Sequence, residues 1–152
     1  MEVASLVSWR RISAALGLMS AASTIAVAGG YVLKWLTTRV YREDVPQAEY
    51  FFVTALIAGL AVVEAGLALR PSDAHRVFAM AAVGGLIFAT GIGASIVFFE
   101  TGYWLLLTGA FGLLGAVFAA AETPRRVVLA ALGLIAAFPL AIALGFLEHL
   151  LR

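Results

Sequence analysis

The amino-acid sequence predicts an all-α protein, a bundle of five transmembrane helices. Composition and charge placement carry this prediction. Hydrophobic residues make up 63% of the chain and charged residues only 12%, whereas an average soluble domain has about 25% charged residues. The charges lie in short clusters, and each apolar run between clusters is long enough to cross a bilayer, which takes about 20 residues. We therefore expect one integral membrane domain, residues 1–152, with spans at 12–36, 50–69, 77–99, 103–121 and 127–147.

The number of spans depends on residues 77–121, which contain a single charged residue, Glu100. One helix of that length would measure about 67 Å, more than twice the roughly 30 Å of a bilayer core. The run is therefore predicted to be two spans joined by a turn at the membrane interface. We place the turn at Glu100–Gly102, because Glu100 is the only charge and Gly102 permits the backbone that a short turn often needs.

The first span follows Trp9, Arg10 and Arg11. A cleaved signal peptide is the alternative, because basic residues precede the apolar stretch and residues 26–28 have the small side chains of a cleavage site. The apolar run continues well past that site to Leu36, so a retained helix is the preferred interpretation. A polar loop of residues 37–49 then leads to the second span.

Residues that flank the later spans predict how those helices begin and bend. Ser72 or Asp73 offers a side-chain acceptor that can cap the third helix. Thr123 followed by Pro124 is typical of an N-cap with proline at the first helical position. Pro139 lies inside the fifth span and predicts a kink, because it removes one backbone hydrogen bond. A hinge is one interpretation of Pro139, and the ordinary tolerance of proline in membrane helices is the simpler one.

The distribution of basic residues predicts the orientation in the membrane. Cytoplasmic segments carry an excess of lysine and arginine. Segments on the side of the N-terminus hold Arg10, Arg11, Arg70, Arg76, Arg125 and Arg126, and the opposite segments hold Lys34, Arg39, Arg42 and Arg152. We therefore expect the N-terminus inside and the C-terminus outside. The preference for arginine over lysine, with abundant alanine, is typical of a GC-rich or thermophilic source. We expect the plasma membrane of a prokaryote.

Small residues recur four positions apart in several spans, which places them on one helix face. Helices in a bilayer associate by close approach, and small residues permit it. The predicted packing residues are Gly85, Ala89, Gly93, Gly112, Ala116, Gly133 and Ala137. A tight intramolecular bundle is the preferred interpretation, and a set of dimerisation faces is the alternative.

Glu64 is the candidate with the most specific signal, since it lies within the second span. An ionised carboxylate inside a bilayer costs a few kcal/mol on insertion scales. Such a residue is expected to face the bundle interior and find a partner, or to stay protonated. Ser20, Ser23 and Thr24 of the first span lie at depths where they can meet it. The functional interpretation is a proton or ion relay or a substrate contact, and the structural one is a neutral acid that bonds a neighbouring helix.

The remaining residues offer little chemistry. Glu100 is interpreted as a turn residue, and His75 and His149 fall near opposite membrane faces, where they cannot ligate one haem together. The chain has no cysteine and a net charge of only +1, which predicts neither a thiolate metal site nor a basic field for nucleic acid. Nucleotide-binding and hydrolase motifs are missing from the sequence. We expect no catalytic residues, no metal and no cofactor, and do not expect an enzyme.

These observations favour an accessory or assembly subunit of a larger membrane complex, or a self-associating helix bundle. The expected partners are the lipid bilayer and other membrane subunits or further copies of the chain. A small transporter or proton-coupled permease that uses Glu64 is the alternative.

Overall fold

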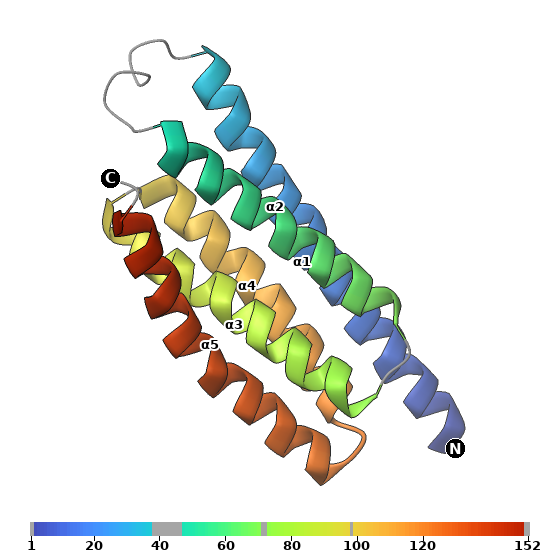
Figure 1. Cartoon of the computed structure of the whole chain (residues 1–152). Helices are drawn as coiled ribbons and strands as arrows, with labels where there is room; N and C mark the ends of the chain where they lie inside the picture. Colours follow the sequence, from blue (N-terminus) through green and yellow to red (C-terminus); the bar gives the residue numbers. More distant parts are fainter. Residues whose placement is uncertain (1, 38–46, 71–72, 98, 151–152) are drawn as a thin grey trace.

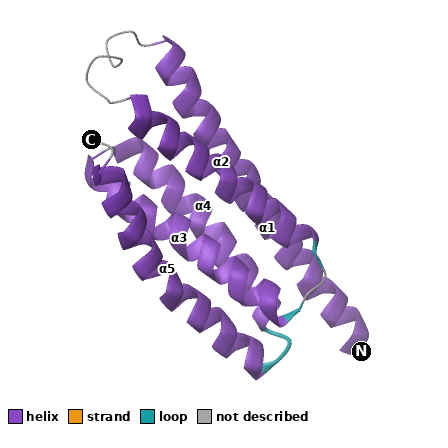
Figure 2. Cartoon of the chain, viewed as in Figure 1, coloured by secondary structure: helices purple, strands orange, loops and turns teal. Residues whose placement is uncertain are grey.

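The computed structural model is built from five α-helices, and the residues it describes contain no strand (Figure 2). It describes residues 2–37, 47–70, 73–97 and 99–150. The helices are α1 (Glu2–Thr37), α2 (Gln47–Leu69), α3 (Ala74–Val97), α4 (Phe99–Ala120) and α5 (Pro124–Leu150). All five are long and apolar enough to cross a membrane. The predicted all-α class with five membrane helices is confirmed.

Helix α1 begins ten residues before the predicted span. Its 36 residues correspond to about 54 Å of helix, more than a bilayer core requires. The start of α1 accordingly projects beyond the other helices at the end where the N-terminus lies (Figure 1). The predicted polar loop of residues 37–49 falls largely outside the described residues.

The turn between α3 and α4 does not lie at Glu100–Gly102, where the sequence placed it. α3 ends at Val97 and α4 begins at Phe99, so Glu100 and Gly102 belong to the first turn of α4. Gly102 has no left-handed backbone. It is buried, and a methyl group at Gly91 of α3 would lie 3.1 Å from its carbonyl oxygen. Gly102 is therefore a helical residue at the contact of α4 with α3, and it is Gly91 that must be small there.

The first turns of α3 and α5 follow from their flanking residues. The backbone N–H of Arg76 donates to Oδ1 of Asp73 at 2.6 Å, which satisfies one free donor at the start of α3. The predicted cap is therefore Asp73, and Ser72 lies outside the described residues. Pro124 is the first residue of α5, a position where no backbone donor is needed. The carbonyl of Thr123 accepts from the N–H groups of Arg126 and Val127.

The main helix contacts are those of α1 with α2 and α4, of α4 with α3, and of α3 with α5, and α5 lies at one edge of the bundle (Figure 1). Smaller contacts join α2 to α3 and α4 to α5. Only 11% of the α5 span and 28% of the α2 span are buried, compared with 50% for α3. The bundle is therefore centred on α3 and α4, and its two edge helices keep most of their surface open.

Glycine allows α3 and α4 to approach each other closely. A methyl group at Gly109 of α4 would lie 2.5 Å from the backbone nitrogen of Phe88, and one at Gly84 of α3 would lie 2.8 Å from that of Leu113. Carbon atoms cannot approach a backbone so closely, so any larger residue at these positions would push the helices apart. Close approach of backbones through glycine is how membrane helices gain van der Waals contact without a hydrophobic driving force.

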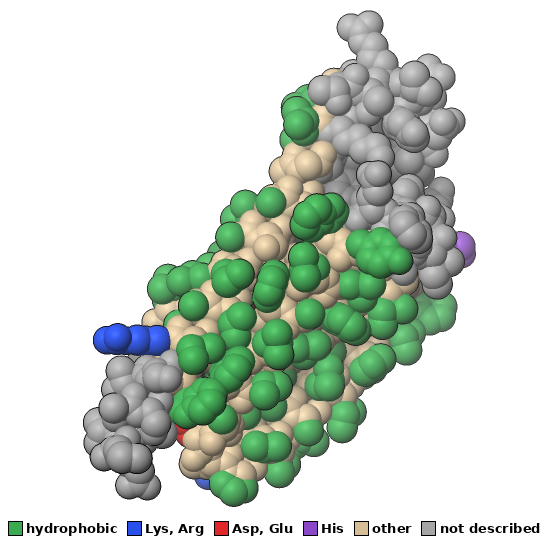
Figure 3. Space-filling view, turned by 180° about the vertical axis from the view of Figure 1, so that it is seen from behind, with side chains coloured by type: hydrophobic (Ala, Val, Ile, Leu, Met, Phe, Trp, Pro, Cys, Tyr) green, Lys and Arg blue, Asp and Glu red, His purple; other side chains and the backbone are tan. Residues whose placement is uncertain are grey.

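The outer surface is apolar along the helices, and the charged side chains that the view shows gather toward one end (Figure 3). We call this the basic end: it comprises the start of α1, the α2–α3 and α4–α5 links, and the residues Arg10, Arg11, Arg70, Arg76, Arg125 and Arg126. This distribution suits a body whose middle lies in hydrocarbon and whose ends meet water.

Candidate functional site

Glu64 lies inside the bundle, with only 5% of its surface exposed. It projects from α2 toward α1 and α4, whereas its neighbours Val62 and Val63 are exposed on the outer side of the helix. The helix therefore turns its one intramembrane carboxyl group away from lipid, as the energetic cost of a charge in hydrocarbon requires.

Two hydroxyl groups of α1 contact the Glu64 carboxyl group. Ser20 Oγ lies 2.6 Å from Glu64 Oε1, and Thr24 Oγ1 lies 3.1 Å from Glu64 Oε2. Each hydroxyl is also within bonding distance of a backbone carbonyl, 2.8 Å from Thr108 O for Ser20 and 2.8 Å from Ser20 O for Thr24. Ser20, Thr24 and Thr108 are fully buried. We call Glu64, Ser20, Thr24 and Thr108 the Glu64 cluster, and it links α1, α2 and α4.

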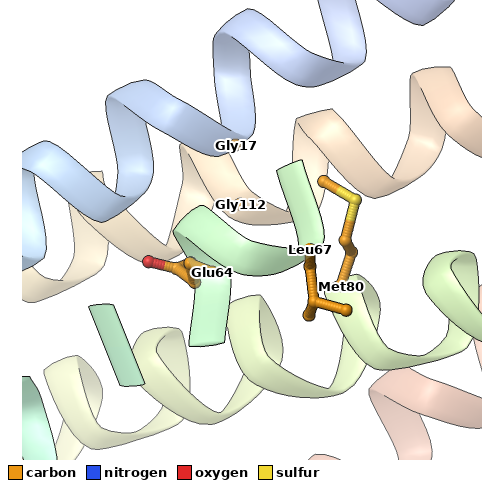
Figure 4. A pocket seen from close by; sticks show the side chains of 5 residues that line it. All are labelled: Gly17, Glu64, Leu67, Met80 and Gly112. Carbon is orange, nitrogen blue, oxygen red and sulfur yellow. The ribbon is translucent and has the colours of Figure 1, made fainter. Parts of the chain in front are cut away.

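A small cavity adjoins the Glu64 cluster, between α1, α2, α3 and α4 (Figure 4). It is lined by Gly17, Glu64, Leu67, Met80 and Gly112 and has a volume of about 10 Å³. That is close to the smallest space that can hold one water molecule. A methyl group at Gly112 would lie 2.9 Å from Glu64 Oε1, so the glycine makes room for the carboxyl group.

A second buried polar group lies nearer the basic end. Arg76 of α3 is only 4% exposed. Its Nη2 lies 3.4 Å from Ser13 Oγ of α1 and 3.4 Å from the carbonyl of Ala68, and its Nε has no hydrogen-bond partner among the described residues. Ser13 in turn donates to the carbonyl of Gly115 at 2.8 Å. Arg76 is thus a buried cation with long and incomplete hydrogen bonding.

An ion-pair cluster closes the basic end. Glu122, in the link that follows α4, pairs with Arg10 of α1 at 2.9 Å and with Arg126 of α5. The Glu122 side chain is only 7% exposed, whereas that of Arg10 is 58% exposed. One carboxylate therefore joins the ends of three helices.

Other residues singled out from the sequence lie apart from the Glu64 cluster. Ser23 is half-buried and does not contact Glu64 through any hydrogen bond in the described part of the chain. Pro139 is exposed within the continuous helix α5. Helix α4 contains Glu100, but its side chain lies outside the described residues. His75 and His149 are exposed near opposite ends, and the described residues contain no group of three potential metal ligands.

The small residues predicted for packing lie mostly at helix contacts. Gly85, Gly112, Ala116, Gly133 and Ala137 are buried. A methyl group at Gly85 would lie 3.0 Å from Ala137 Cβ, which joins α3 to α5. Ala89 is half-buried, and a methyl group at Gly93 would meet no atom within 4 Å. The four-residue ladder of α3 therefore packs near Gly85 and is open at Gly93.

Sequence reasoning missed Ser13, Arg76 and Thr108 as members of buried polar groups. Ser13 carried a detectable signal, because it stands seven residues before Ser20 and therefore on the same face of α1. Arg76 was assigned to a loop, although it lies in the first turn of α3 and points into the bundle. Thr108 contributes its backbone carbonyl, and a backbone contact leaves no mark in the sequence.

The fold and the buried cluster define the class of this protein: a small polytopic integral membrane protein whose chemistry-bearing groups lie inside its helix bundle. The chain belongs to DUF6518, described as a family of unknown function, whose family model matches residues 1–151. No match was found among curated proteins or among solved structures.

Proposed function

We propose that this protein is an accessory or assembly subunit of a larger membrane complex, and that the outer face of α2 receives a helix of a partner subunit. The observation that carries the proposal is the setting of Gly59 and Gly66. Both lie within the α2 span, seven residues apart and so on one face. Both are exposed, and a methyl group at either would meet no atom within 4 Å.

In the described part of the chain, neither glycine makes a close helix contact that requires a small residue. Glycine inside a helix costs about 1 kcal/mol relative to alanine, and α3 and α4 offset that cost by close approach at Gly84 and Gly109. In α2 nothing in the described chain offsets it. A helix of another subunit packed at Gly59 and Gly66 would offset this cost, because small residues allow the backbones of membrane helices to approach closely.

The open edges of the bundle support the same function. Only 28% of the α2 span is buried, so most of that helix is available to a partner. The cavity beside Glu64 is too small for an organic solute at about 10 Å³. Both observations favour a protein that binds other membrane helices over one that carries a solute through its own centre.

Purification from native membranes tests the proposal. The tagged chain, extracted in mild detergent, should bring down a specific membrane subunit identified by mass spectrometry. Replacing Gly59 and Gly66 by leucine should remove the partner without unfolding the bundle, because space is open at both sites. Ala143→Leu, at an exposed site on α5, is the matched control and should retain the partner. Recovery of the chain as a monodisperse monomer would contradict the proposal. Recovery of only additional copies of the same chain would show that it self-associates and does not act as an accessory subunit.

Proton-coupled transport is the second candidate, and the Glu64 cluster is the observation that favours it. A carboxyl group held by two hydroxyls inside a membrane can take up and release a proton. Reconstituted vesicles with an imposed pH gradient provide the test. If the protein transports, Glu64→Gln should abolish proton flux while the bundle remains folded. Equal flux in vesicles with the native chain, the Gln variant and no protein would exclude this candidate.

A further inference from the structure

The buried face of α1 carries a polar stripe with a regular spacing. Its members are Arg10, Ser13, Gly17, Ser20 and Thr24, which are separated by three, four, three and four residues and so line one face of the helix. Ser13, Ser20 and Thr24 are fully buried. Gly17 carries no side chain, and the small cavity lies beside it. The stripe therefore leads from the Glu64 cluster to the ion pair of Arg10 at the basic end.

The stripe runs in one direction only. From Ser20 to Arg10 it covers ten residues, about 15 Å of helix, or half of a bilayer core. Beyond Thr24 the next buried side chain among the described residues of α1 is Ala28, which is apolar. On α2, the buried side chain one heptad from Glu64 toward the opposite end is Ile57. Within the described residues, the polar groups of α1 thus lie between Glu64 and the basic end, and Ala28 and Ile57 lie on the other side. The nearest polar side chains of α2 and α3 on that other side are Thr54, whose Oγ1 is buried, and Thr90, whose Oγ1 donates to Leu86 O.

Met80 fills the gap in the stripe. Its terminal carbon lies 3.2 Å from the position of a methyl group at Gly17, where Ala68 Cβ of α2 also lies at 2.9 Å, and 3.1 Å from that at Gly115. It therefore occupies the space between the small cavity and the Ser13–Arg76 group, and Figure 4 shows it reaching from α3 toward α1. Methionine is unbranched and flexible, so its thioether can change rotamer and admit water beside Gly17.

Hydrogen counting in the Glu64 cluster favours a protonated carboxyl group. Four oxygen–oxygen contacts of 2.6–3.1 Å join Glu64, Ser20, Thr24 and two backbone carbonyls. The two hydroxyls supply one hydrogen each. With a third hydrogen on Glu64, the acid donates to Ser20 Oγ, Ser20 donates to Thr108 O, and Thr24 donates to Ser20 O. If Glu64 is ionised, only the two hydroxyl hydrogens remain for the four contacts. A hydroxyl that donates to the carboxylate then no longer donates to its backbone carbonyl.

Among the described residues, the groups that face Glu64 from the surrounding helices are uncharged. α1 presents Ser20 and Thr24, α4 presents the Thr108 carbonyl and Gly112, and α3 presents Met80. The first charged group along the stripe is Arg76, beside Ser13. Its positive charge opposes the entry of a hydronium ion, so it slows proton exchange along this route without supplying a counter-ion to Glu64.

We propose that Glu64 is a protonation site that exchanges its proton with water at the basic end alone, along the polar stripe of α1 and past Met80. The proton comes from water at that end and returns to it, and the oxygen that carries it inside the bundle is Glu64 Oε1 or Oε2. This inference rests on the interior of the bundle and is independent of whether a partner binds the outer face of α2.

Infrared spectroscopy of the full chain in lipid bilayers tests the proposal. The carbonyl stretch of a protonated carboxylic acid should be visible at neutral pH and absent from Glu64→Gln. On transfer to D₂O its shift reports proton exchange at Glu64. Met80→Ala, which widens the route from the basic end, should speed the exchange several-fold. Ile57→Ala, which removes a buried side chain on the opposite side of Glu64, is the matched control and should leave the rate unchanged.

Three results would overturn the proposal: no Glu64-dependent acid band, no acceleration in Met80→Ala, or equal acceleration in Ile57→Ala. Helix content by circular dichroism checks that each variant is folded. If Met80→Ala does not fold, Leu67→Ala opens the same cavity and carries the same expectation. Arg76→Gln provides an independent arm, because loss of the positive charge beside Ser13 should also speed exchange.

Discussion

The hydroxyl groups of Ser20 and Thr24 contact Glu64, but each also contacts a backbone carbonyl that does not depend on Glu64. Both hydroxyls also lie 2.8 Å from a backbone carbonyl. Removal of the carboxyl group therefore leaves neither hydroxyl without an acceptor. This arrangement separates the structural role of Glu64, which is modest, from any chemical role, which depends on its ability to carry a proton.

Glu64→Gln should leave stability almost unchanged. The amide oxygen can accept from Ser20, and the amide N–H can donate to Thr24 Oγ1. Glu64→Leu should lower the free energy of unfolding by about 1 kcal/mol, since it removes two side-chain hydrogen bonds that average roughly 0.6 kcal/mol each in membranes. Unfolding in mixed micelles measures both values. If Glu64→Gln lowered the free energy of unfolding as much as Glu64→Leu, the structural role would require the carboxylic acid itself.

Glu122 joins the ends of α1, α4 and α5 through Arg10 and Arg126. Because the Arg10 side chain is 58% exposed, its coupling to Glu122 should be as weak as that of a surface ion pair and should fall with salt. A double-mutant cycle with Arg10→Gln and Glu122→Gln, measured at low and high salt, gives this coupling directly. Coupling that stays constant with salt would indicate that water does not reach the pair.

At the scale of helices, glycine decides which pairs approach closely. Gly109→Ala should destabilise the bundle by about 1–3 kcal/mol, the usual cost of overpacking, because the new methyl group would lie 2.5 Å from the Phe88 backbone. Gly66→Ala is the matched control, since its methyl group meets nothing within 4 Å. It should stabilise the monomer by about 0.5–1 kcal/mol. Thermal denaturation in detergent micelles compares the two, and similar effects would contradict the close approach of α3 and α4.

The sequence predicted where the helices lie along the chain better than which helix faces pack against each other. Apolar runs bounded by charge identify a span because the bilayer imposes its length. The bilayer does not dictate which faces meet, and the alanine-rich spans offer small residues on several faces. The four-residue ladder through Gly85 and Gly93 was visible, but α4 packs on α3 through Gly84 and Gly91 instead. Gly102 was interpreted as a turn residue for a similar reason: glycine serves both turns and close packing, and the sequence does not distinguish them.

The Glu64 cluster was partly predictable. The depth of a residue along a span follows from counting, so Ser20 and Thr24 could be placed beside Glu64 once α1 and α2 were taken as neighbours. The carbonyl of Thr108 and the space made by Gly112 depend on where α4 packs. Arg76 shows the opposite difficulty, since an arginine beside a loop is usually solvated, and its burial follows from a helix that begins earlier than expected.

For the whole molecule, the basic end predicts the orientation. Cytoplasmic loops carry the excess of arginine and lysine, so Thr123, at the basic end, should face the cytoplasm and His149, at the far end of α5, should face outward. Because the chain has no cysteine, single cysteines at these two positions can be labelled with an impermeant reagent in intact cells. The His149→Cys variant should react and the Thr123→Cys variant should react only after lysis. The reverse pattern would invert the orientation.

The contact between α1 and α2 also bears on the order in which the protein is made. Chains fold from the N-terminus during synthesis, so α1 is in place before α2 leaves the ribosome. Glu64 therefore enters the bilayer next to a helix that already presents Ser20 and Thr24. Thr108 stands 44 residues further along the chain, so the carboxyl group meets its two hydroxyl partners before α4 is available. If the hydroxyls were on α4 instead, the carboxyl group would remain in lipid without a partner until the α4 span begins at Gly102, nearly forty residues after Glu64. The placement of these groups on the first two helices makes the α1–α2 hairpin a self-sufficient unit for membrane insertion.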